Sequence, residues 1–164
     1  MEEKTYLVLF WGNMIPLQGV PYIRRAAELL WNEPIEIQIL GDPKVPQHEL
    51  PDRIRKADIC LGIFGDTDKA TRVIPNKVYE AIAMKKAVIS ADTPAIRELF
   101  SDRENILLCK RASPESLAEK IKELCEDQNL RNHIAEGGYR LFQERATPKI
   151  IGKELLDILC ASKI

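Results

Sequence analysis

Two consecutive turns from a strand into a helix, between residues 59 and 97, constrain the fold more than any other feature. A buried strand is predicted over Ile59–Phe64 (ICLGIF) and a second over Ala87–Ala91 (AVISA). One helix is expected to begin at Pro75-Asn76, and another is expected after Asp92-Thr93-Pro94. Strands that alternate with helices in this way form a parallel sheet, and both helix N-termini then lie at its carboxyl edge.

That edge of the sheet is the predicted location of a binding site. The first N–H groups of a helix have no partner within the helix and carry a partial positive charge, so they suit phosphate. In open sheets of this kind, ligands bind outside the carboxyl ends of the strands. We therefore expect a ligand beside the polar loop over residues 65–72 and the helix that follows it.

The rest of the chain continues the alternation of strands and helices. Further strands are predicted over Tyr6–Trp11, Glu36–Leu40 and Ile106–Cys109. The prediction is one α/β domain over residues 1–164, with a Rossmann-like parallel sheet of about five to six strands and helices on both faces.

The C-terminal part, from about residue 114 onward, is predicted to be helical. Ser113-Pro114 and Thr147-Pro148 each place a capping hydroxyl before a proline at the first helical position. Between these two helices lies a third, with Gly137-Gly138 as a place to break or kink. The last helix has an apolar face formed by Ile150, Ile151, Leu155, Leu156 and Leu159.

Composition excludes several classes of protein. The net charge is −1 and the charges are spread along the chain, so there is no basic stripe for nucleic acid. No apolar run reaches the roughly 18 residues that a membrane span needs. The four cysteines lack the spacing of a zinc site and are interpreted as buried or semi-buried thiols in a reducing cytosol; they are Cys60, Cys109, Cys125 and Cys160. No metal is expected, and His48 and His133 are interpreted as surface residues.

Lys77 and Glu80 stand out on the helix that begins at Asn76, because residues three apart lie on the same side of a helix. They are expected to project together, away from the face that packs on the sheet. One interpretation is that the Lys77 ammonium group and the first N–H groups of the helix hold phosphate while Glu80 accepts hydrogen bonds from sugar hydroxyls. The alternative is an exposed salt bridge on an ordinary helix, worth about 0.2–0.5 kcal/mol.

Several segments resemble one known family, and they occur in the family's order. They are LVLFWGNMIPLQGVPYI, ADICLGIFG, RVIPNKVYEAIAMKKAVISADTPAIRELF and SPESLAEKI. Together they are similar to the C-terminal, donor-binding domain of the GT-B, family-4-type (group 1) glycosyltransferases. The resemblance is to the branch with a PNKVYEA helix, which acts in polysaccharide and lipid-linked glycan synthesis and is mannosyltransferase-like.

The resemblance implies roles for individual residues. Glu80 matches the second glutamate of the family's E-x7-E motif, which binds the ribose hydroxyls of the donor. Val73, Ile74 and Asn76 fall on the turn that approaches the donor's sugar and diphosphate. Gly12 matches the glycine that faces the donor phosphates.

The sequence also departs from the family pattern. Arg72 stands where the motif has its first glutamate, and Asn13 and Gln18 stand where the loop after the first strand has an arginine and a lysine. A diphosphate leaving group needs compensating positive charge in a partly dry site. We therefore expect the cations to have moved across the cleft, to Lys77, Arg72 and Lys69.

A further departure concerns length. The family has two strands and a helix between about residues 33 and 57, where this sequence has room for one clear strand. Either a βα unit is missing or the loop over residues 41–51 is remodelled. The difference affects the outer edge of the sheet rather than the expected site.

The resemblance implies a cytoplasmic, retaining glycosyltransferase without a cofactor, with a UDP- or GDP-sugar as the donor. The chain would be the donor-binding half, inactive without an N-terminal acceptor-binding domain or subunit, and any association with a membrane would come through that missing half. The alternative is a non-catalytic binding or regulatory module, favoured by Arg72, Asn13 and Gln18, which predicts no nucleotide binding. A receiver-type or dinucleotide-binding domain fits less well, because the first strand ends without an acidic pocket or a G-x-G-x-x-G motif.

Overall fold

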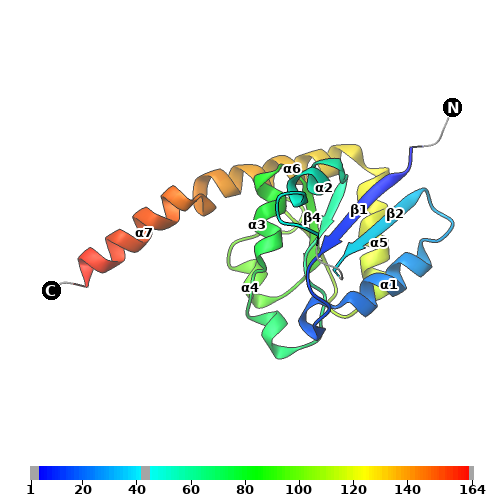
Figure 1. Ribbon diagram of the computed structural model, residues 1–164, viewed down its shortest axis with the longest axis horizontal. Coiled ribbons are helices and arrows are strands. Elements are labelled where there is room, and N and C mark those ends of the chain that lie inside the picture. The colour runs from blue at the N-terminus through cyan, green and yellow to red at the C-terminus, as the bar shows by residue number, and fades with distance from the viewer. Residues whose placement is uncertain (1–3, 42–44, 163–164) are drawn as a thin grey trace.

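A computed structural model describes residues 4–41 and 45–162, which form a five-stranded parallel sheet in the order β2-β1-β3-β4-β5 (Figure 1). The strands are β1 (Tyr6–Trp11), β2 (Ile35–Leu40), β3 (Ile59–Leu61), β4 (Ala87–Ala91) and β5 (Leu107–Cys109). This confirms the predicted Rossmann-like sheet. The described residues of the region between 33 and 57, which are 33–41 and 45–57, hold one strand, β2, and it forms an edge of the sheet.

Seven α-helices accompany the strands in the described residues. They are α1 (Val20–Leu29), α2 (Leu50–Lys56), α3 (Asn76–Ala83), α4 (Pro94–Arg97), α5 (Pro114–Glu126), α6 (Gln128–Leu141) and α7 (Pro148–Ala161). Two 3₁₀ turns, η1 (Pro16–Gln18) and η2 (Asp68–Thr71), lie in the loops after β1 and β3, and a π-helical turn, η3 (Phe142–Ala146), joins α6 to α7.

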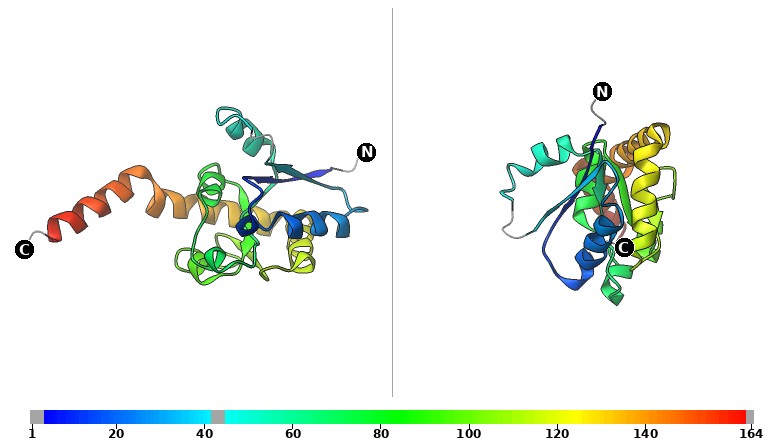
Figure 2. Two further views of the ribbon diagram at one scale, coloured as in Figure 1. Left: turned by 60° about the horizontal axis from the view of Figure 1, so that its bottom comes forward. Right: turned by 90° about the vertical axis from the view of Figure 1, so that its right-hand side faces the viewer.

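The sheet separates two hydrophobic layers. Successive residues of a strand point to opposite faces, so Phe10 of β1 packs with helices α1 and α5, whereas Leu9 and Trp11 pack with α2, α3 and α4. Figure 2 shows the helices arranged on both sides of the sheet. The central strands are buried on both faces, which explains why their sequences are continuous apolar runs.

The predicted caps form where the sequence places them. The hydroxyl oxygens of Thr93, Ser113 and Thr147 each accept a hydrogen bond from the backbone N–H three residues later, at the starts of α4, α5 and α7. Helices α3 and α4 therefore follow β3 and β4 as expected, and both begin at the carboxyl edge of the sheet.

Helix α6 continues through Gly137-Gly138, so these residues do not break it. A side chain at Gly137 would place its Cβ 2.0 Å from the carbonyl oxygen of Glu104, and one at Gly138 would lie 2.9 Å from Ile82. The two glycines let α6 pass closely over α3 and the loop before β5. They are needed for packing rather than for a turn.

Two expectations about burial and length are corrected, and one is confirmed. The β3 ladder ends at Leu61 rather than Phe64, although Ile63 and Phe64 are still buried. Cys160 is exposed, whereas the other three cysteines are buried, and all four are free thiols. Both histidines are exposed as expected, with His48 at 82% and His133 at 57% of their side-chain surface.

Helix α7 extends away from the body of the domain (Figures 1 and 2). Its apolar face is present as the sequence predicts, but it is exposed to solvent. Ile151, Leu155, Leu156, Ile158 and Leu159 each retain more than half of their surface. None of the helices in residues 4–41 and 45–162 has the length and apolar character that crossing a membrane requires.

Gly137→Ala is expected to destabilise the fold by about 2 kcal/mol, because overpacking a side chain against fixed backbone costs about 1–3 kcal/mol. Gly152→Ala is the matched control: it is also a glycine inside a helix, but nothing lies within 4 Å of its Cβ position, and alanine favours the helix. Urea denaturation measures both. Equal free energies of unfolding for the two variants would contradict the packing role of Gly137.

Candidate functional site

The candidate site is built on the loop that follows β1, residues 12–19, which we call the first loop. Its backbone is fixed to the end of β3: the N–H of Phe64 donates to the carbonyl of Gln18 at 3.1 Å, and the N–H of Gly65 donates to the carbonyl of Leu17 at 3.2 Å. Gly19 has φ +73°, and a Cβ there would lie 2.5 Å from Gly65 N. Only glycine fits between the two backbone segments at this position. Gly19 therefore lets the first loop lie close to the sheet.

Lys77, in the first turn of α3, reaches the first loop from the other side. Its Nζ lies 2.5 Å from Oε1 of Gln18 and 3.7 Å from the centre of the Phe10 ring. Gly12, with φ +146°, leaves the space that Nζ fills, because a Cβ at this position would lie 2.9 Å from it. One buried amine thus lies directly against Gly12 and Gln18 of the first loop.

Burial controls the charge of this amine. Lys77 is only 6% exposed, and this desolvation lowers the pKa of Lys77 to about 7, while the negative charge of Glu80 acts in the opposite direction. The expectation that Lys77 projects away from the packed face of α3 is therefore wrong. The first loop packs against the Lys77 side chain and buries it, whereas Asn76 at the start of the helix stays exposed.

Asn13 and Gln18 extend the polar contacts from Lys77. The amide nitrogen of Gln18 donates to Oδ1 of Asn13 at 3.2 Å, while its amide oxygen faces Lys77. These are the two positions at which the sequence departs from the arginine and lysine of the family pattern. Neutral amides therefore occupy the first loop, and the buried cation on α3 lies directly against them.

Glu80 lies one helical turn beyond Lys77 and is engaged with the end of β1. Its Oε2 accepts a hydrogen bond of 2.8 Å from the indole Nε1 of Trp11. Glu80 is otherwise exposed. Lys77 and Glu80 thus both face the first strand and its loop, rather than forming a pair on an open helix surface.

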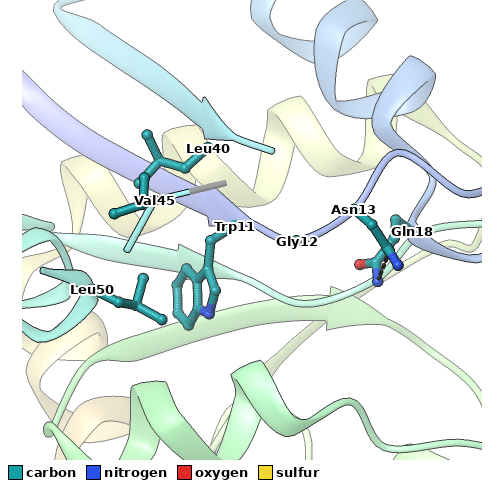
Figure 3. Close-up of a pocket in the computed structure, with 7 residues that line it drawn as sticks. All are labelled: Trp11, Gly12, Asn13, Gln18, Leu40, Val45 and Leu50. Carbon is teal, nitrogen blue, oxygen red and sulfur yellow. Dashed lines mark hydrogen bonds between the residues drawn. The ribbon is translucent and has the colours of Figure 1, made fainter. Parts of the chain in front are cut away.

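A pocket of about 300 Å³ opens beside these residues (Figure 3). One part is polar and is formed by the first loop, whereas the other is apolar and comes from β2, α2 and the segment between them. The lining residues are Trp11, Gly12, Asn13, Gln18, Leu40, Val45 and Leu50. In Figure 3 the indole of Trp11 stands between the two parts.

The remaining predicted residues lie on the segment before α3. Val73 and Ile74 are half-buried, and Asn76 is exposed at the start of the helix. Arg72 pairs with the Asp68 carboxylate, with 70% of its side chain exposed. In this structure Lys77 is the cation that contacts the first loop, whereas Arg72 faces solvent.

Sequence reasoning missed the aromatic and aliphatic part of the site. The sequence predicts Trp11 only as the last residue of a buried strand, and Leu40, Val45 and Leu50 only as strand or loop residues. A signal for Trp11 existed, because an indole with an N–H donor at the end of a strand needs a polar partner when it is buried. The partner, Glu80, is 69 residues away in the sequence.

Within the described part of the chain, no three His, Cys, Asp or Glu side chains gather into a group that could hold a metal ion. The acidic residues near this edge have other partners. Asp92 accepts a two-fold hydrogen bond from Arg97, which together with Arg97's charge lowers the pKa of Asp92. Asp68 pairs with Arg72.

Fold and site together define a Rossmann-like α/β domain with a polar site at the carboxyl edge of its sheet. A family model described as glycosyl transferase-like matches residues 7–157. The match covers most of the sequence, and this chain belongs to the glycosyl transferase-like family.

One curated relative is TuaC of Bacillus subtilis (strain 168), named for a glycosyltransferase of teichuronic acid biosynthesis. It is 23% identical over 151 residues, and the match covers 84% of this chain and 37% of TuaC. The chain therefore spans little more than a third of this relative.

Solved structures show the same fold. The C-terminal domain of a group 1 glycosyl transferase, LpcC of Francisella tularensis, has a TM-score of 0.75 at 22% identity, with 88% of each chain covered. HepE of Anabaena, solved in complex with UDP and glucose, has a TM-score of 0.78 at 16% identity, over 98% of this chain and 49% of that one. The fold is thus that of the C-terminal half of a GT-B glycosyltransferase.

The buried amine predicts a pH dependence of stability. The pKa of Lys77 is about 7 in the folded chain against 10.5 as its ordinary value, so above pH 7 the unfolded chain binds more protons than the folded one. Stability then rises with pH, with a limiting slope of about 1.4 kcal/mol per pH unit. The rise should be seen between pH 7 and 9; above the ordinary cysteine pKa of 9.0, the pKa values of about 12 of the buried thiols act in the opposite direction.

Lys77→Met, which keeps a long side chain without the amine, is the comparison for this prediction. Urea denaturation at several pH values from 7 to 9 should give a free energy of unfolding that rises for the parent chain and stays level for Lys77→Met. Parallel curves for the two proteins would show that Lys77 keeps its proton in the folded chain.

Proposed function

We propose that this chain is the donor-binding half of a glycosyltransferase, which binds a nucleoside-diphospho-sugar for transfer to a glycan or lipid-linked acceptor. The observation that carries the proposal is the placement of one buried amine, that of Lys77, and one carboxylate, that of Glu80, beside the first loop. A cation and a hydroxyl acceptor one helical turn apart suit a diphosphate joined to a ribose. Membership of the glycosyl transferase-like family supports this reading.

The diphosphate is proposed to lie over Gly12, at the N-terminus of α3. Here the Lys77 amine, the first N–H groups of α3 around Asn76 and the amide of Gln18 offer hydrogen-bond donors. A phosphate next to Nζ would favour its charged form, since an opposite charge raises the pKa of an amine. Lys77 would then exchange the Gln18 oxygen for phosphate oxygens.

The ribose is proposed to be held by Glu80. An ionised carboxylate accepts several hydrogen bonds, and in this structure Glu80 is exposed on the side away from Trp11. Val73, Ile74 and Arg72 are proposed to complete the site from the segment before α3. For Arg72 this requires release from its exposed pair with Asp68.

In the proposed reaction an acceptor hydroxyl replaces the nucleoside diphosphate at the anomeric carbon, with retention of configuration. The bond from the sugar to the diphosphate breaks, one to the acceptor oxygen forms, and the hydroxyl proton is released. Positive charge at the diphosphate stabilises the departing group. This chain contributes that charge, and an N-terminal acceptor-binding domain or subunit is proposed to contribute the acceptor site, so that the chain alone is inactive.

The donor is proposed to be a UDP- or GDP-sugar, bound without a cofactor. The structure of HepE with UDP and glucose supports a uridine nucleotide, and the name of TuaC supports a polysaccharide product; a mannosyl donor is the corresponding GDP-sugar hypothesis. A cytoplasmic location is proposed as well, in keeping with four free thiols.

A second candidate function is a non-catalytic binding or regulatory module. It is favoured by the hydrogen bonds of the first loop. The neutral side chains of Asn13 and Gln18 bond to each other, and the Lys77 amine already donates a hydrogen bond to Gln18. If Lys77 keeps its bond to Gln18 at all times, its amine cannot bind phosphate, and no nucleotide is expected to bind.

Calorimetric titration with UDP, GDP, ADP and the corresponding UDP- and GDP-sugars separates the two candidates. Saturable binding of one nucleotide is expected for the parent chain. Lys77→Ala should weaken it by about 1.5–3 kcal/mol, because the amine bonds a charged group, and Glu80→Ala by about 1–3 kcal/mol.

The control variant is Arg25→Ala, which removes an exposed cation that pairs with Glu28 on α1. It should bind as the parent does. Binding that Lys77→Ala leaves unchanged would exclude Lys77 as the phosphate ligand, and absence of binding by every nucleotide would favour the non-catalytic module.

A further inference from the structure

Trp11 connects the candidate site to the rest of the fold. It is the last residue of β1, is 7% exposed, and packs with Leu9 and Val78 in the layer between the sheet and α3. Its indole Nε1 donates to Oε2 of Glu80 at 2.8 Å. This is the bond by which the end of β1 holds a side chain of α3.

The bond restricts a side chain that would otherwise be mobile. Glu80 is exposed on a helix, and fixing a free glutamate side chain costs conformational entropy. Because Trp11 is buried, its N–H has a fixed position, and it holds the carboxylate in one orientation before any ligand arrives. Only one lone pair of the carboxylate is used in this way, and the others stay open for further donors.

A pair of adjacent hydroxyls needs an acceptor of this kind. Two donors on neighbouring carbon atoms can bond the same carboxylate only if it is correctly oriented. Loss of that orientation should therefore weaken binding of a ligand with both hydroxyls and leave the affinity of a ligand without them unchanged. This distinguishes an orienting residue from one that merely shapes the pocket.

We propose that Trp11 is a positioning residue, whose indole N–H holds the Glu80 carboxylate ready to accept hydrogen bonds from the vicinal hydroxyls of the bound ribose. The inference rests on the proposed function, because it needs a nucleoside diphosphate as the ligand. It assigns to the end of β1 a role in recognition of the sugar.

The chain offers a direct way to observe this contact. It contains two tryptophans, and the other, Trp31, is 83% exposed. Trp31→Phe therefore leaves Trp11 as the single tryptophan fluorophore and the single indole N–H resonance. All variants are prepared in this background, and each is titrated with UDP and GDP and with their 2′,3′-dideoxy analogues.

Trp11→Phe is expected to weaken binding of the ribonucleotide about tenfold, the scale of one lost hydrogen bond to a charged group, and to leave the dideoxy analogue within about two-fold of the parent. Glu80→Gln should likewise weaken binding of the ribonucleotide only. The double variant, Trp11→Phe with Glu80→Gln, should bind the ribonucleotide no more weakly than the weaker-binding of the two single variants. Equal weakening of both ligands by Trp11→Phe would overturn the proposal and leave Trp11 as packing.

A second replacement of Trp11 separates loss of the hydrogen bond from disruption of the fold. Replacement of Trp11 by β-(3-benzothienyl)alanine keeps the size and shape of the ring and removes only the N–H donor. Selective loss of ribonucleotide affinity with this residue supports the proposal, and unchanged affinity overturns it. If the Trp31→Phe chain and the parent both fail to bind every nucleotide, the proposed function fails, and the role of Trp11 fails with it.

Discussion

The contact between Lys77 and Gln18 is the interaction on which the site depends. A buried amine needs a polar partner, and here the partner comes from the first loop, which is itself held to the end of β3 by two backbone hydrogen bonds. The contact therefore joins β1, β3 and α3 at one point. The opening of the pocket, the lowered pKa of the Lys77 amine and the closeness of Glu80 to Trp11 all follow from the way these three elements meet.

The architecture could largely be predicted from the sequence, and the reason is physical. Central parallel strands are buried on both faces, so they are continuous apolar runs, and hydroxyl caps before prolines mark helix starts such as Ser113. The placement of Lys77 could not be predicted in the same way. Helical periodicity identifies which residues share a face, but it does not say what covers that face, and the cover comes from a loop some 60 residues earlier.

The same limit applies to Trp11 and to helix α7. The bond from Trp11 to Glu80 joins positions 69 residues apart, and no local sequence pattern predicts it. In α7 the apolar spacing correctly indicates an amphipathic helix, yet its apolar face is exposed here. A pattern of this kind shows that a face can be buried, whereas the partner that would bury it has to be found in the structure.

The two walls of the pocket differ in how freely they can change during evolution. Behind the wall made by the first loop, backbone packs on backbone at Gly19 and Gly65, which admit no side chain. The opposite wall consists of the aliphatic side chains of Leu40, Val45 and Leu50, which come from the edge strand β2, from α2 and from the segment between them. Divergence among related chains should therefore accumulate on the aliphatic wall, while the wall made by the first loop stays as it is.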